Sequence, residues 1–253
     1  MYGLLLATLA GLCTGIGSAI ALALKQLKGW QLALILGFSA GVMTYVSFAE
    51  LLTQAVKQAG LLQANILFFV GFAFIAVLDL VIPHQYKAEE LDDHHPLLGG
   101  QHSALMRIGI FTSIGIAIHN IPEGLVVFAG ASSGDVSLGV LVATAIALHN
   151  IPEGIAVSVP VKEATGNARM AFLLSFAAGL AEPLGALLGY LILSPFLTTS
   201  FVAGLLTFAA GIMIYISLDE LVPTAHRYGA AHWAILGVGL GMAVMAGSVL
   251  LIS

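Results

Sequence analysis

The stretch His-Asn-Ile-Pro-Glu-Gly at residues 119–124 returns letter for letter at residues 149–154. Both copies lie inside long apolar runs of the length that spans a membrane. An ionised side chain in such a run costs roughly 2.5 to 3.5 kcal/mol on insertion scales, so charges at this depth are usually functional or paired. The duplicated stretch therefore predicts a buried functional site.

Helix geometry places the polar residues of each copy on one side of a helix. At about 100° per residue, the carboxylate of Glu123 lies at an angle between the imidazole of His119 and the amide of Asn120. The second copy repeats this layout, so two facing helices would present two imidazoles and two carboxylates in one cluster. Two amides would share the same carboxylates in a neighbouring cluster. The candidate ligands are His119, Asn120, Glu123, His149, Asn150 and Glu153, with Glu182 as a third mid-span carboxylate.

Imidazole nitrogen and carboxylate oxygen together form the ligand set that zinc and similar divalent ions take in proteins. An intramembrane histidine can instead hydrogen-bond another helix, and a proline inside a span can simply kink it. A glutamate four residues after the histidine in both copies favours the metal site. Pro122 and Pro152 also leave the carbonyls of Ile118 and Leu148 without a helical N–H, which provides either further oxygen ligands or a hinge.

The composition is that of an integral membrane protein. The chain has 253 residues, of which 59% are hydrophobic and 8% are charged, and its mean hydropathy is +1.04. A soluble domain would carry about 25% charged residues. The formal net charge of -5 offers no case for nucleic acid as a partner. The single cysteine, Cys13, excludes an internal disulfide.

Apolar runs of about 20 residues, the length that crosses the hydrocarbon of a bilayer, number eight in this sequence. No basic segment precedes the first run, so we expect it to remain as a span rather than to be cleaved as a signal peptide. We expect one transmembrane domain over residues 1–253, in a multi-pass protein of the cell membrane. The predicted spans cover residues 3–24, 31–53, 64–83, 105–130, 136–160, 168–194, 200–222 and 232–252.

One connection is long, at about residues 85–104, and it contains several histidine and acidic residues. Such a tract binds metal weakly in some proteins and is simply a solvated loop in others. Lysine and arginine indicate its side of the membrane, because seven of the eight lie after the first, third, fifth and seventh spans. By the positive-inside rule, the long loop is predicted to be cytoplasmic and both termini extracytoplasmic.

A second internal similarity relates residues 40–51 to residues 210–221. These segments lie in the second and seventh spans, which cross in opposite directions, as do the fourth and fifth spans that carry the duplicated stretch. Similar segments of opposite direction are typical of inverted repeats, which place a substrate site near the membrane midplane. The predicted fold is all-α, with eight spans in a 3+2+3 arrangement of inverted repeats.

Further acidic residues fall near the ends of spans. Glu50 is expected near the outer end of the second span, and Asp79, Asp219 and Glu220 near the inner ends of the third and seventh. They would place carboxylates on both sides of the midplane, as a cation path requires. Residues at span ends also commonly do no more than contact water. Glycine pairs four residues apart on several spans predict close helix packing and are compatible with a homodimer.

The doubled motif, the eight spans and the histidine-containing loop after the third span resemble the ZIP (Zrt-, Irt-like) family of divalent-metal transporters, in particular its bacterial ZupT-like branch. The resemblance covers nearly the whole chain. It implies a binuclear metal site between the fourth and fifth spans, and transport into the cytoplasm. One ion would take His119, Glu123, His149 and Glu153, and its neighbour Asn120, Asn150 and Glu182, with Glu123 and Glu153 as bridges. Glu50 would serve the outer entrance, and Asp79, Asp219 and Glu220 the cytoplasmic exit.

The expected function is uptake of a divalent transition metal, with zinc first. The same nitrogen and oxygen ligands also fit iron, manganese, cobalt and cadmium. These ions would be substrates, and no resident cofactor is expected. A metal exporter remains an alternative, as does an intramembrane metalloenzyme, which needs an open position for water and a base, often as H-E-x-x-H. This chain has H-N-x-P-E in duplicate instead, so we expect no enzymatic activity.

Overall fold

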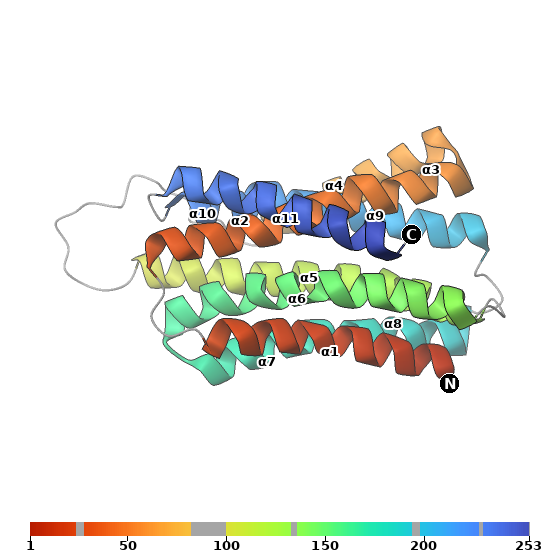
Figure 1. The fold of residues 1–253 in the computed structure, drawn as a ribbon, viewed down its shortest axis with the longest axis horizontal. Coiled ribbons are helices and arrows are strands. Elements are labelled where there is room, and N and C mark those ends of the chain that lie inside the picture. The colour runs from red at the N-terminus through yellow and green to blue at the C-terminus, as the bar shows by residue number, and fades with distance from the viewer. Residues whose placement is uncertain (24–27, 82–99, 133–135, 194–197, 228–229, 253) are drawn as a thin grey trace.

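The computed structural model describes the chain except for residues 24–27, 82–99, 133–135, 194–197, 228–229 and 253 (Figure 1). All elements of the described residues are helices, which confirms the predicted all-α class. In chain order they are α1 (Tyr2–Ala23), α2 (Gly29–Tyr45), η1 (Val46–Leu52), α3 (Thr53–Ala59), α4 (Leu61–Val81), α5 (Gly100–Ser132), α6 (Val136–Thr165), α7 (Ala168–Gly179), α8 (Ala181–Leu188), η2 (Gly189–Leu193), α9 (Thr199–Tyr215), η4 (Ile216–Leu221), α10 (Val222–Arg227) and α11 (Ala231–Ile252).

Among the described residues, eight helical stretches are long and apolar enough to cross a membrane, as predicted. The second and seventh run further than expected, over Gly29–Ala59 and Thr199–Arg227, because each continues through a π-helical segment into a short α-helix. Polar residues mark where a span leaves hydrocarbon rather than where its helix ends. Only Gly60, at φ +85°, separates α3 from α4. Similarly, α5 begins at Gly100, inside the predicted loop of residues 85–104. The rest of that loop lies outside the described residues.

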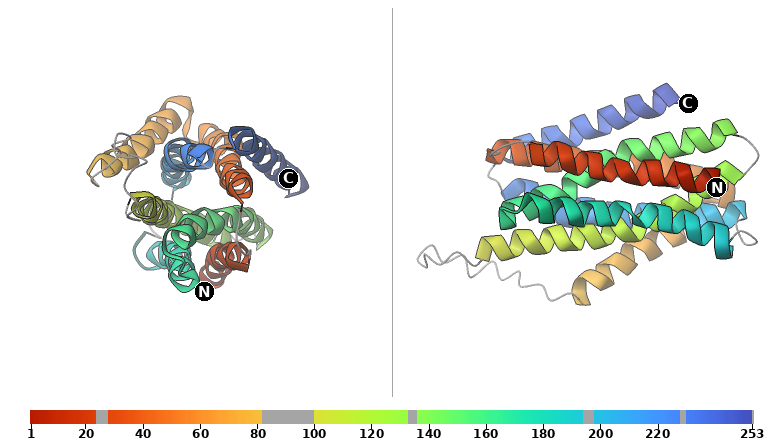
Figure 2. Two further views of the ribbon diagram at one scale, coloured as in Figure 1. Left: turned by 90° about the vertical axis from the view of Figure 1, so that its left-hand side faces the viewer. Right: turned by 90° about the horizontal axis from the view of Figure 1, so that it is seen from below.

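The spans form two groups that lie side by side (Figures 1 and 2). In the first group, α1 packs along α6, α6 along α5, and α5 along α8, while α7 contacts α1 and α6. In the second group, α2 packs along α11 and α4 along α9. The groups meet mainly where α5 contacts α9 and where α2 contacts α6. The helices that carry the duplicated motif, α5 and α6, therefore lie at this boundary.

Matched contacts support the inverted repeat inferred from the sequence. A methyl group on Gly41 of α2 would lie 2.1 Å from the carbonyl oxygen of Val238, and one on Gly211 of α9 would lie 2.0 Å from that of Phe68. One offset of 170 residues relates Gly41 to Gly211 and Phe68 to Val238. The same offset relates the start of η1 to the start of η4. At both contacts two helix backbones touch where only glycine fits. Both termini lie at the same end of the molecule (Figure 1).

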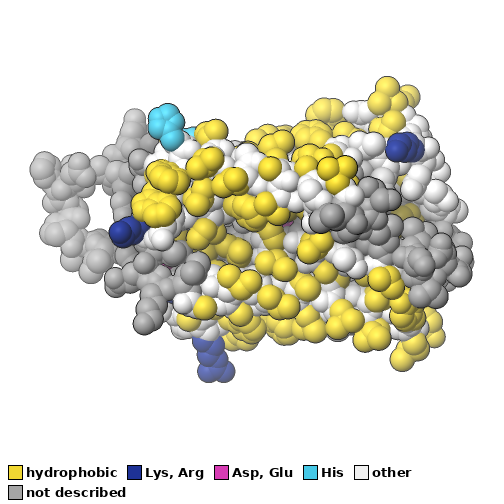
Figure 3. Space-filling model, viewed as in Figure 1, with side chains coloured by type: hydrophobic (Ala, Val, Ile, Leu, Met, Phe, Trp, Pro, Cys, Tyr) yellow, Lys and Arg dark blue, Asp and Glu magenta, His cyan; other side chains and the backbone are white. Residues whose placement is uncertain are grey.

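The outer surface is apolar, as contact with lipid requires. Large hydrophobic side chains point outward along the spans, with Leu62 76% and Leu80 79% exposed on α4 and Leu250 77% exposed on α11. In Figure 3 hydrophobic side chains cover the length of this face, while the lysine and arginine side chains lie toward its two ends. This is the surface of a multi-pass membrane protein.

Candidate metal centre

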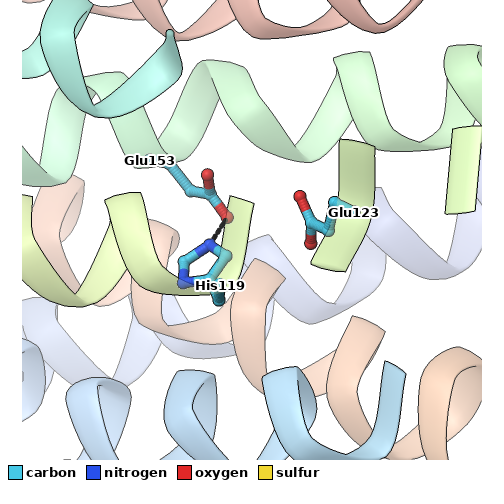
Figure 4. Close-up of side chains that lie close together, drawn as sticks. All are labelled: His119, Glu123 and Glu153. Atoms are coloured by element: carbon cyan, nitrogen blue, oxygen red, sulfur yellow. Dashed lines mark hydrogen bonds and ion pairs between the residues drawn. The ribbon is translucent and has the colours of Figure 1, made fainter. Parts of the chain in front are cut away.

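The two copies of the motif meet between α5 and α6. His119 and Glu123 come from α5 and Glu153 from α6, and none of the three side chains is exposed. One candidate ligand atom from each lies within 4.8 Å of the others. Nε2 of His119 is 2.9 Å from Oε1 of Glu153, and Glu123 lies beside this pair (Figure 4). The helical spacing of four residues brings Glu123 to the same side of α5 as His119, so two of the donors come from a single helix.

His149 occupies the equivalent place on α6, one turn before Glu153. Its side chain lies outside the described residues. The four-ligand set of two histidines and two glutamates therefore stays a prediction, and the structure brings three of its four members together.

The two motif asparagines are held by the helices that flank α5 and α6. Nδ2 of Asn120 donates to the carbonyl oxygen of Ala178 at 3.1 Å, and Nδ2 of Asn150 donates to that of Ala10 at 3.0 Å. Because only the amide nitrogen can donate to a carbonyl, these bonds fix which way each amide faces. Each Oδ1 atom is buried and has no hydrogen-bond partner among the described residues. A buried acceptor of this kind suits a cation.

Glu182 joins the site from the sixth span, which breaks at Leu180 between α7 and α8. The Glu182 carboxylate is fully buried, and its Oε2 accepts a hydrogen bond from Nδ2 of Asn150 at 2.6 Å. One amide thus contacts both the first span, through Ala10, and the sixth span, through Glu182. The structure therefore places the third carboxylate next to Asn150 of the duplicated motif.

Electrostatics give this cluster a strong preference for positive charge. Glu123, Glu153 and Glu182 are all completely buried. Two carboxylates 4 Å apart repel by about 4 kcal/mol at an effective dielectric constant near 20, so protons or metal ions must accompany them. Oε2 of Glu153 is also buried without a hydrogen-bond partner in the described part of the chain. The donor set of imidazole nitrogen with carboxylate and amide oxygen fits Zn2+ and related ions.

A second acidic cluster lies toward the end of α4 that leads into the long loop. Candidate ligand atoms of Asp79, Asp219 and Glu220 lie within 4.8 Å of one another. The hydroxyl of Tyr215 donates to Oδ2 of Asp79 at 2.9 Å. The structure therefore brings together the three residues expected on the inner side. Glu50 lies apart from them on η1, partly buried.

Several contacts of the site were not foreseen from the sequence. The carbonyls of Ala10 and Ala178 anchor the asparagines, and hydroxyl groups bind the motif backbone: Ser39 donates to the carbonyl of Pro152 and Ser175 to that of Gly154. A carbonyl has no sequence signature, because every residue carries one. The only available signal was the glycine-rich packing of the neighbouring spans.

Comparison with known proteins identifies the family to which this chain belongs. The ZIP zinc transporter family model matches residues 83–248. The chain is 51% identical to the zinc transporter ZupT of Chlorobium luteolum over 260 residues, which cover 99% of this chain and 97% of that protein. It is 46% identical to the zinc transporter ZupT of Streptococcus mutans, with 98% and 96% covered, and 48% identical to that of Nitratidesulfovibrio vulgaris, with 96% and 94% covered. Such identity over full length extends the resemblance carried by the doubled motif to the whole chain, which therefore belongs to the ZIP family of zinc transporters, in its ZupT-like branch.

Proposed function

We propose that the protein takes up Zn2+ across the cell membrane into the cytoplasm through the site between α5 and α6. The observation that carries this proposal is the buried meeting of His119, Glu123 and Glu153 from two spans of opposite direction. The names of the ZupT relatives, all zinc transporters, support zinc as the substrate. Iron, manganese, cobalt and cadmium ions can use the same donors, and we propose them as further substrates.

The site is proposed to hold two ions that share carboxylates. His119 and His149 belong to one ion, and Asn120, Asn150 and Glu182 belong to its neighbour. Glu123 and Glu153 bridge the two. The orientation of both amides supports this division, because their Nδ2 atoms are engaged by carbonyls while the oxygens remain for a cation. Together, three carboxylates compensate most of the charge of two divalent ions.

The ion path follows the acidic residues on either side of the centre. Glu50 would receive the ion near the outer surface, and the cluster of Asp79, Asp219 and Glu220 would accept it toward the cytoplasm. This direction rests on the distribution of lysine and arginine residues, which predicts a cytoplasmic long loop. Access would alternate as one group of spans moves against the other around the site.

Export of the metal and intramembrane catalysis are the competing functions. An exporter would use the same ligands in the opposite direction. A metalloenzyme needs a metal position open to water beside a general base, whereas the side chains of Glu123 and Glu153 are completely buried. The inverted pairing of α5 with α6 suits alternating access and provides nothing that hydrolysis requires.

Uptake into vesicles tests the proposal. The full chain is reconstituted into proteoliposomes, protease accessibility of the long loop reports its orientation, and radioactive Zn2+ is followed after addition to the extracytoplasmic side. We expect saturable uptake that is abolished in Glu153→Ala and retained in Thr207→Val, a buried substitution on α9. Competition by the other divalent ions measures the substrate range. Movement only toward the extracytoplasmic side would establish an exporter, and absence of movement in either direction would reject transport.

A further inference from the structure

The first and sixth spans contact the motif helices in the same way. A methyl group on Gly17 of α1 would lie 1.9 Å from the carbonyl oxygen of Ile151, and one on Gly185 of α8 would lie 2.1 Å from that of Ile121. The two asparagine anchors, Ala10 on α1 and Ala178 on α7, are also equivalent. Adding 168 to the residue number of each of these α1 positions gives the number of its counterpart in the sixth span. Two flanking helices thus enclose the centre symmetrically.

At this offset Thr14 is the counterpart of Glu182. Both side chains are completely buried, and both lie where the first span crosses the sixth. A methyl group on Gly179 would lie 3.1 Å from Oγ1 of Thr14, and a methyl group on Gly11 would lie 3.4 Å from Cβ of Glu182. Thr14 therefore occupies on α1 the position that corresponds to the position of Glu182 on α8. Glu182 reaches the site from this position.

The hydroxyl of Thr14 lacks the hydrogen bond that threonines on these helices usually make. A helical threonine commonly donates to the carbonyl four residues earlier. For Thr14 that carbonyl belongs to Ala10, which accepts from Asn150 instead. Oγ1 of Thr14 is buried and has no hydrogen-bond partner among the described residues. Among the described residues, the threonines that bond four residues back are Thr8, Thr44, Thr144, Thr165 and Thr207. Thr112 on α5 also has a buried hydroxyl without a hydrogen-bond partner, but only Thr14 is related to Glu182 by the offset of 168 residues.

We propose that Thr14 is a further residue of the second ion position, where its hydroxyl binds the divalent cation through one water molecule on the side opposite Glu182. This rests on the proposed function. The ligands of that ion come as the symmetric pairs Asn120 with Asn150 and Glu123 with Glu153, so the ion lies on the symmetry axis. Glu182 then approaches from the sixth span and Thr14 from the first. A threonine hydroxyl is two bonds shorter than a glutamate carboxylate, which leaves roughly the room of one hydrogen-bonded water.

The choice of threonine has a consequence for the substrate. A glutamate at this position would add a fourth buried carboxylate and hold two divalent ions more tightly. The hydroxyl supplies a hard, neutral oxygen without adding charge. Thr14 therefore weakens retention of the second ion relative to a symmetric site, which suits an ion that must leave again.

Zn2+ binding to the purified full chain in lipid nanodiscs tests this role. Equilibrium dialysis gives the affinity of each ion, and the second ion is identified as the one that Glu182→Gln loses. We expect Thr14→Val to weaken the second ion roughly tenfold, the loss of about one hydrogen bond, and to leave the first within twofold. Thr14→Ser, which keeps the hydroxyl, should restore wild-type affinity. Thr207→Val, which removes a buried hydroxyl from α9, should change neither ion.

The outcomes separate this inference from the proposed function. If the wild type binds two Zn2+ ions and Thr14→Val binds both as tightly, the inference is wrong while the two-ion site stands. Equal weakening of both ions by Thr14→Val, without rescue by Thr14→Ser, would assign Thr14 to packing alone and also overturn the inference. A wild type with no ion that depends on Glu182 would reject the two-ion site itself. If Thr14→Val does not fold, Thr14→Ala is compared with Thr14→Ser under the same criteria.

Discussion

The contact of α1 with α6 couples backbone packing to the metal site, and a single methyl group tests the coupling. A methyl group on Gly154 would lie 1.9 Å from the carbonyl oxygen of Thr14, whereas real Cβ atoms stay at least 3.0 Å from such neighbours. The two helices must therefore separate by about 1.1 Å, the difference between these distances. One turn away, the bond from Asn150 to Ala10 is 3.0 Å long, so the same displacement would stretch it to about 4.1 Å and break it.

The energetic consequence of Gly154→Ala has two parts. Overpacking of a close contact costs typically about 1 to 3 kcal/mol. A buried carbonyl left without its donor costs about 1 to 3 kcal/mol more. We expect the melting temperature of the purified protein to fall by roughly 5 °C or more. Zn2+ affinity should fall at least tenfold, because the Asn150 oxygen loses its fixed direction and every 1.4 kcal/mol corresponds to a factor of ten.

Thermal melting and Zn2+ dialysis of the same preparations measure both effects. Gly239→Ala is the matched control, because an added methyl group at Gly239 on α11 meets nothing within 4 Å. Gly124→Ala should behave like Gly154→Ala, since its methyl group would lie 1.9 Å from the carbonyl oxygen of Glu182. Unchanged Zn2+ affinity in Gly154→Ala, with the control also unchanged, would refute the coupling of this contact to the site.

Three further predictions concern the charges of the path. Zn2+ binding should release protons and weaken as the pH falls from 8 to 5. The ion would take Nε2 of His119 and Oε1 of Glu153, which share a proton in their hydrogen bond, and that proton must then leave for solvent. Calorimetry in buffers of different ionisation enthalpy measures the release, and an affinity that stays constant over this pH range would contradict it. Glu123→Gln should weaken Zn2+ binding by roughly a thousandfold, because about 4 kcal/mol of attraction is lost and every 1.4 kcal/mol is a factor of ten; equilibrium dialysis measures this affinity. Tyr215→Phe should leave binding at the centre unchanged and slow uptake about threefold through loss of the hydrogen bond to Asp79; equal rates would remove Tyr215 from the exit path.

Much of this architecture could be predicted because the membrane simplifies the rules. Hydropathy and length locate the spans, since hydrocarbon thickness fixes the minimum run of apolar residues. Helical spacing alone places Glu123 beside His119, and opposite directions of α5 and α6 bring Glu153 to the same cluster. The predicted helix ends were less accurate. Helix α3 extends to Ala59 and α10 to Arg227, because a helix continues beyond the hydrocarbon wherever its backbone remains hydrogen-bonded.

The supporting contacts could not be predicted, for two physical reasons. Backbone carbonyls such as those of Ala10 and Ala178 become specific only when helices cross at a particular depth. Thr14 was not predicted as a site residue. The repeat that relates it to Glu182 preserves the close packing of small residues, but the first and sixth spans have few identical residues at equivalent positions. The role proposed for Thr14 rests on its equivalence to Glu182 together with its buried hydroxyl, which has no hydrogen-bond partner among the described residues.

The choice of asparagine explains how ion binding and helix packing are joined. An amide has both a donor and an acceptor: the nitrogen of Asn150 ties α6 to α1 and to Glu182, while its oxygen has no hydrogen-bond partner among the described residues and is available to the proposed cation. Asn120 ties α5 to α7 in the same way, so each helix from α5 to α8, and α1, supplies either a proposed ligand or a carbonyl that anchors one. Among the described residues, the hydroxyl of Ser39 on α2 in the second group donates to the carbonyl of Pro152, which is backbone and not a proposed ligand. We therefore expect the first group to move with its ions as one unit, because relative motion within it would break the ligand shell, whereas motion between the groups would not.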